Sequence, residues 1–192
     1  MQTAQLSFSD VFNRVCDGYG PWQDPLYAQA LDELRATSTQ TDDNISDALV
    51  GLGIPIREAL KVPPGSVIKY VNALLTGYAT QIHALVSYTY LEMDGAPVTQ
   101  AACGNMMPTN EGSYSAWLDE DGVWTPGYMS NLRWDNLHRA GASFSIYRDM
   151  GGTYTVYVNH FRLYVEFQLP AVLSGRMNGI IPSPLGRPMG LS

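Results

Sequence analysis

Apolar positions in the first part of the chain recur three and four residues apart, the spacing of a helix face. Leu26, Ala30 and Leu34 follow Asp24-Pro25, a pair typical of a helix start because Asp caps the first turn and Pro is tolerated at its first position. The same spacing predicts further helices over residues 9–18, 44–52 and 66–78, the last of which has the clearest pattern.

After about residue 83 the apolar period changes from helical to alternating, which indicates β-strands. Residues 84–93 alternate and end in Asp94-Gly95, a dipeptide that favours a tight hairpin turn. Two more hairpins are predicted over residues 114–125 and 143–158, with a long loop over residues 104–113.

The clearest strand covers residues 161–169, where odd positions are apolar and even positions are polar. In the preceding segment, residues 154–158, the apolar side chains occupy even positions. Because a strand repeats every two residues, a bulge or a turn must lie at Asn159-His160 to change the phase.

The end of the chain has a different composition. Seven of the nineteen residues from Ser174 to Ser192 are Gly or Pro, and none is acidic. Such a segment cannot build a core of its own. We therefore expect an α+β fold with a helical N-terminal part (residues 1–80), an antiparallel β-sandwich or barrel-like part (81–173) and an extended arm (174–192).

The composition favours contacts with other proteins. Charged residues make up 15% of the chain, against about 25% in a typical domain, and Lys61 and Lys69 are the only lysines. Interfaces show the same depletion of lysine. The net charge of −7 argues against nucleic-acid binding, and no apolar stretch is long enough to span a membrane.

Motifs for catalysis, cofactors or metals are not found in the sequence. The acidic run at residues 119–121 fits either a solvated hairpin turn or a weak cation site. His83, His138 and His160 have no second ligand at metal spacing, and no nucleophile elbow or dinucleotide loop is present. We predict no enzyme activity, no cofactor and no metal.

Aromatic residues gather in the turn-rich stretch after residue 113. They fit three roles that the sequence does not separate, namely core packing, contact with a partner protein or stacking on a sugar. These residues are Tyr114, Trp117, Trp124, Tyr128 and Trp134.

The main functional prediction is a structural one: a homo-oligomeric building block of a large particle, namely a viral or phage virion component such as a capsid, connector or tail protein. Its partners would be copies of itself and other particle proteins, and it would be assembled in the cytoplasm. The alternatives are a receptor- or glycan-binding recognition module and an enzyme with a dispersed site. Candidate contact residues are Trp117, Trp124, Tyr128, Trp134, Arg176 and Arg187.

Overall fold

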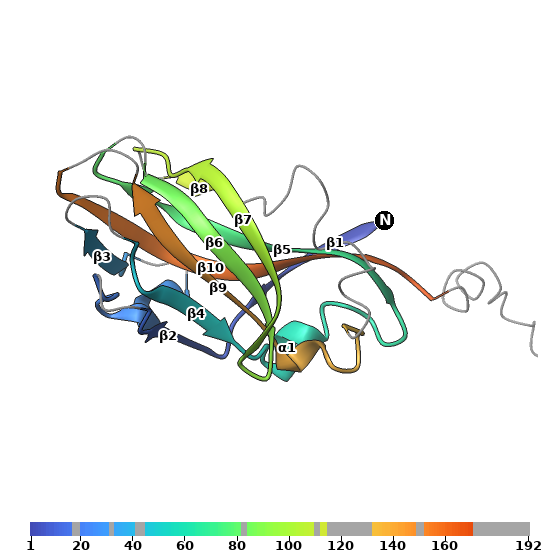
Figure 1. Ribbon diagram of the computed structural model, residues 1–192. Coiled ribbons are helices and arrows are strands. Elements are labelled where there is room, and N and C mark those ends of the chain that lie inside the picture. Colours follow the sequence, from blue (N-terminus) through green and yellow to red (C-terminus); the bar gives the residue numbers. More distant parts are fainter. Residues whose placement is uncertain are drawn as a thin grey trace, which may run out of the picture.

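Two antiparallel β-sheets packed face to face make up the described part of the chain (Figure 1). In sheet A the strand order is β1 (Gln2–Ser7), β10 (Tyr154–Gln168), β5 (Val67–Ala79) and β8 (Gly112–Tyr114), and β3 (Ala36–Gln40) also pairs with β10. In sheet B the order is β2 (Asp10–Arg14), β4 (Ala48–Leu52), β9 (Ala140–Arg148), β6 (Ala84–Met93) and β7 (Ala96–Met106). The computed structural model describes residues 1–16, 20–30, 33–40, 45–81, 84–109, 112–114, 132–148 and 152–170.

The helical segments in these ranges are single turns. They are the 3₁₀ turn η1 (Pro25–Ala28), the four-residue helix α1 (Ile56–Ala59) and the 3₁₀ turn η2 (Leu137–Arg139). None of the described helices is long and apolar enough to cross a membrane. The predicted helical N-terminal part is therefore wrong, and the fold is a β-sandwich rather than α+β.

The strongest predicted helix, over residues 66–78, is the long strand β5, and a β-bulge explains the error. Pairing with β10 passes from Tyr70 to Ile68, so Lys69 has no partner and the side chains change face there. The bulge puts the buried residues Ile68 and Val71 three apart, which imitates helical spacing. Half-buried Leu74 on the opposite face completes the false pattern.

The other predicted N-terminal helices fail for a related reason. Residues 10–14 and 48–52 are β2 and β4, which pair with each other, and each strand is too short to display its alternation. Asp24-Pro25 does start a helical turn, but η1 ends at Ala28. Asp24 adopts a left-handed conformation with φ of 48° instead of capping the turn with its side chain.

Several of the strand predictions are confirmed. Strand β6 covers residues 84–93 and forms a hairpin with β7 through Asp94-Gly95, both of which have positive φ, as a tight hairpin turn requires. The phase change before residue 161 is a bulge at Asn159, where the pairing with β5 skips from Val158 to His160.

Two other β predictions need correction. The predicted hairpin over residues 143–158 is wrong, because β9 lies in sheet B and β10 in sheet A, so their connection crosses between the sheets. The predicted loop over residues 104–113 is shortened at both ends, where β7 extends to Met106 and β8 begins at Gly112. Most of the predicted hairpin over residues 114–125 and the whole predicted arm lie outside the described residues.

A chain of aromatic rings joins the two sheets at the core. Phe161 of β10 lies 5.1 Å from Phe144 of β9 and 4.9 Å from Phe8, measured between ring centroids. The Trp22 ring joins this cluster, with its centroid 5.6 Å from that of Phe144. The Trp22 Nε1 donates a hydrogen bond to the Asp47 carbonyl at 2.8 Å. All four rings are buried, so this cluster holds the sandwich together.

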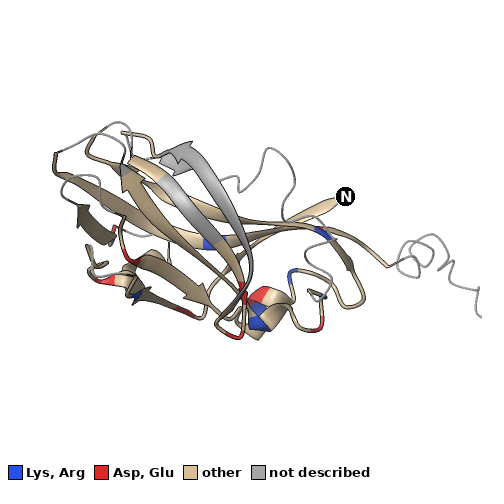
Figure 2. Ribbon diagram, viewed as in Figure 1, with Lys and Arg blue, Asp and Glu red and all other residues tan. Residues whose placement is uncertain are grey.

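Charged residues are sparse on the strands; many lie around α1 and the β6–β7 turn, and a second group lies around β2 and η1 (Figure 2). An ion pair joins these two groups, between Arg14, at the end of β2, and the buried Glu92 of β6. The guanidinium donates from Nη1 to Oε1 at 2.7 Å and from Nη2 to Oε2 at 2.8 Å. The Glu92 side chain is completely buried, so Arg14 supplies its neutralising charge.

Candidate functional site

A polar pocket opens at the end of the sandwich, in the turn that leads into β9. We call it the end pocket. It has a volume of about 550 Å³, within the range of small-ligand sites. Its lining consists of Arg133, Asp135, Asn136, His138 and Arg139.

Two buried leucines hold this turn against the core. Leu132 and Leu137 are 8% and 0% exposed, and the residues between them face outward or are half-buried. Within the turn, the Arg133 amide donates to Asn136 Oδ1 at 2.8 Å, and the Asn136 amide donates to the Arg133 carbonyl at 3.2 Å. The polar lining is therefore presented by a turn whose backbone is already fixed.

Neighbouring loops lock the other side of the end pocket. The Ile54 amide donates to the His138 carbonyl at 2.9 Å, and the Asp94 amide donates to the Arg139 carbonyl at 3.1 Å. Arg139 also donates from Nε to Asp94 Oδ1 at 2.8 Å. This hydrogen bond lowers the pKa of Asp94 and raises the pKa of Arg139, so both groups stay charged at neutral pH.

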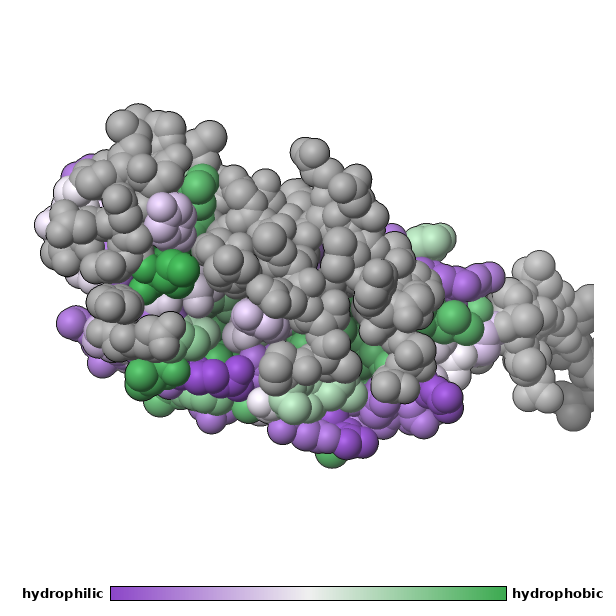
Figure 3. All heavy atoms as spheres, viewed as in Figure 1, coloured by the Kyte–Doolittle hydropathy of each residue, from purple (hydrophilic) through white to green (hydrophobic). Residues whose placement is uncertain are grey.

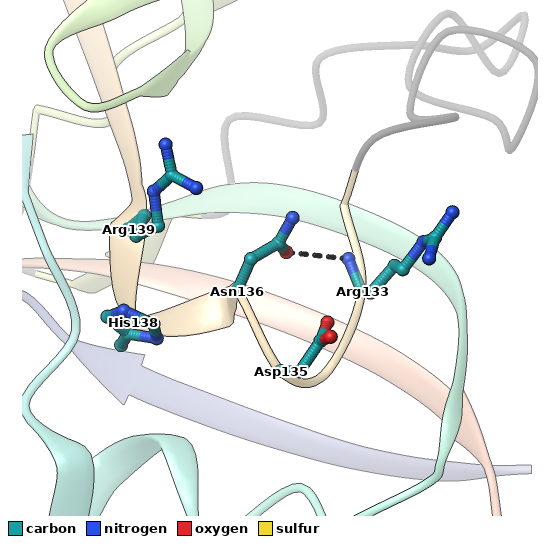
Figure 4. Close-up of a pocket in the computed structure, with 5 residues that line it drawn as sticks. All are labelled: Arg133, Asp135, Asn136, His138 and Arg139. Atoms are coloured by element: carbon teal, nitrogen blue, oxygen red, sulfur yellow. Dashed lines mark hydrogen bonds between the residues drawn. The ribbon is translucent and has the colours of Figure 1, made fainter.

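The end pocket contains both positive and negative side chains, and they differ in whether they are paired. Arg139 is paired with Asp94, whereas the Arg133 guanidinium has no hydrogen bond or ion pair within the described ranges. Figure 4 shows Asp135 and Asn136 between the two arginine side chains. The pocket thus offers guanidinium and amide donors together with carboxylate and amide acceptors.

Trp134 lies in the same turn, between Arg133 and Asp135 in the sequence. It is 38% exposed, which is unusual for so large an apolar side chain. Of the candidate contact residues, it is the one that the structure describes. Trp117, Trp124 and Tyr128 fall in residues 115–131, and Arg176 and Arg187 fall in residues 171–192, all outside the described ranges.

The lining residues of the end pocket were missed from the sequence, apart from His138, which was considered only as a metal ligand. A signal was present, because three polar residues and a tryptophan stand between Leu132 and Leu137, and His138 and Arg139 follow just before an alternating segment. That pattern is typical of an anchored loop with an outward polar face. The contacts predicted from the sequence in this stretch are instead its aromatic residues.

Other candidates for chemistry are not assembled at this pocket. His160 lies at the β10 bulge, where its Nε2 is 3.2 Å from Ser7 Oγ, and it lines neither the end pocket nor the pocket described next. His83 and residues 119–121 lie outside the described ranges. Within those ranges, no three His, Cys, Asp or Glu side chains come together as a metal site.

A second pocket, which we call the edge pocket, lies between β2 and η1. It has a volume of about 500 Å³ and is lined by residues 10–12 and 24–27. Leu26 and Tyr27 are 56% and 40% exposed beside it. Figure 3 shows hydrophobic atoms next to hydrophilic ones on the lower left, the region where Figure 1 places β2.

Together these features define a class: an antiparallel β-sandwich with a polar pocket at one end and an apolar pocket at a sheet edge. No protein-family model matches the sequence, and no curated protein matches it. A similar solved structure is the CBM36-1 domain of a multidomain xylanase from the hindgut metagenome of Trinervitermes trinervoides, at 8% identity and a TM-score of 0.35. The alignment covers 88% of this chain and 100% of that one. At these values the likeness assigns neither a fold family nor a ligand to this chain.

Proposed function

We propose that this chain is a carbohydrate-recognition module that binds a sugar in the end pocket. The observation that carries the proposal is a turn fixed by backbone hydrogen bonds that lines a pocket with five polar side chains and also carries an exposed tryptophan, Trp134. This was the alternative prediction from the sequence. Neither the fold nor the comparisons support the main prediction of a virion component.

The chemistry of the lining suits a sugar. Each sugar hydroxyl both donates and accepts hydrogen bonds, so a sugar is best matched by donors and acceptors in one small space. Asp135 accepts, Arg133 donates, and an amide such as that of Asn136 does both. The apolar face of a sugar ring can stack on an exposed indole, which gives Trp134 a role that core packing does not.

The location also suits recognition. In β-sandwiches the loops at the ends of the sheets carry binding residues while the strands supply a rigid frame. The end pocket follows this arrangement, because backbone hydrogen bonds join its turn to Ile54 and to Asp94 in the β6–β7 hairpin. A site fixed before binding loses less entropy when a ligand arrives.

A glycan array tests the proposal. We expect the full chain to bind at least one class of glycan, and Trp134→Ala or Arg133→Gln to weaken that binding about tenfold, which corresponds to roughly 1.4 kcal/mol. Both side chains are exposed, so the variants should unfold at the same temperature as the parent chain.

Val15→Ala is the matched control. Val15 is 72% exposed and lines neither pocket, so its truncation removes exposed apolar surface without touching the end pocket. Binding equal to that of the parent chain is expected. A chain that binds no glycan, or one whose binding is unaffected by both Trp134→Ala and Arg133→Gln, would disprove the proposed function.

A further inference from the structure

The edge pocket has the character of a docking site for a chain segment. Val11, Phe12 and Pro25 give it an apolar lining, and Leu26 and Tyr27 add exposed apolar surface at its rim. Strand β2 stands at the end of sheet B and pairs only with β4 among the described strands. Apolar surface at such an edge is a place where another chain can bind.

The charge of the edge pocket indicates what its occupant must be. Asp10 and Asp24 line it, and neither carboxylate has an ion pair with any described residue. A fitting segment therefore carries apolar side chains and positive charge without acidic residues.

The chain contains such a segment at its own C-terminal end. Residues 171–192 include Arg176 and Arg187, apolar side chains such as Ile180 and Ile181, and no Asp or Glu. The part of the chain that carries the edge pocket has the opposite charge, since residues 1–60 hold nine acids and three bases. We propose that residues 171–192 of one copy dock in the edge pocket of a second copy.

The segment begins far from the edge pocket of its own copy. The turn η1 packs against β3 and the start of β10, and β3 pairs with residues 154–158. From Val158 to Gln168 the strand runs on for ten residues, about 33 Å, and Pro170 then lies next to Gly65. Pro170, the last described residue before the segment, therefore lies at the end of the sandwich away from the edge pocket (Figure 1), which suits a head-to-tail contact between copies.

Charge exchange in the full chain tests this inference. We expect native mass spectrometry and light scattering to show concentration-dependent association of the parent chain. Asp10→Arg or Arg176→Asp alone should weaken the association about tenfold, and the two together should restore most of it. A structural effect of either substitution would not be repaired by the other, so restoration is specific to contact between them.

Removal of residues 175–192 should abolish the association and leave the unfolding temperature unchanged. A parent chain that stays monomeric at every concentration, including one whose segment docks in its own pocket, would overturn the inference. So would association that survives the truncation, which would point to a different surface. The result does not depend on sugar binding, since Trp134→Ala should leave the association intact.

Discussion

Replacing Arg14 with alanine is expected to cost about 3 kcal/mol of unfolding free energy. Both guanidinium Nη atoms donate to the carboxylate of Glu92, whose side chain is completely buried. Truncation leaves that carboxylate in the interior without its counter-charge, and the penalty for a buried unpaired charge exceeds the worth of the pair itself. Because a third of the Arg14 side chain is exposed, we take the lower end of the usual range.

Urea or thermal unfolding measures this effect, and a loss of 3 kcal/mol should lower the midpoint temperature by roughly 10 °C. Arg139→Ala is the control, because it breaks an arginine–carboxylate pair that is about half exposed on both sides. Such exposed pairs are screened by solvent, so no measurable change is expected there. Equal effects for the two variants would show that the Arg14–Glu92 pair is not buried in solution.

Phe161→Ala is expected to destabilise the chain by about 3–5 kcal/mol, a large part of the roughly 5–15 kcal/mol by which a native domain is stable. The ring is fully buried and contacts Phe8 and Phe144, so it connects the two sheets. Its removal leaves a cavity that backbone pairing on both sides of β10 prevents from collapsing.

Phe161→Leu keeps most of the apolar volume and should cost less than half as much in the same unfolding measurement. A loss below about 1 kcal/mol for the alanine variant would mean that Phe161 does not lie between two packed sheets. The β-sandwich itself would then be in question.

The sequence predicted the C-terminal strands well because their alternation is long and their turns are distinctive. Strand β6 and the Asp94-Gly95 hairpin follow from local rules, and so does an irregularity at Asn159-His160, which the apolar phase left open as a bulge or a turn and which is a bulge. Strand β5 could not be predicted in the same way. The bulge at Lys69 broke its alternation into a helix-like spacing, and only its pairing with β10 reveals the true period.

The assignment of strands to sheets was also beyond local patterns. Strands β9 and β10 are neighbours in the chain with a Gly-rich connection between them, which fits a hairpin equally well as a crossover. Long-range contacts decide this, since β9 pairs with β4 and β6 while β10 pairs with β1, β3 and β5. Sequence spacing carries no information about such pairings.

The lining of the end pocket could not be predicted from the sequence. Trp134 was identified from its aromatic character, but Arg133 and Asn136 belong to the pocket only because Leu132 and Leu137 fix the turn against the core. The edge pocket depends on η1 packing beside β2, and no sequence motif predicts that contact.

Nuclear magnetic resonance titration of the full chain with a glycan identified on the array tests the central claim most directly. We predict that the backbone amide signals that shift will be those of residues 133–139, the Trp134 indole and neighbours in the β6–β7 turn. Saturating shifts confined to another part of the sandwich, or no shift with any glycan, would contradict a sugar site in the end pocket.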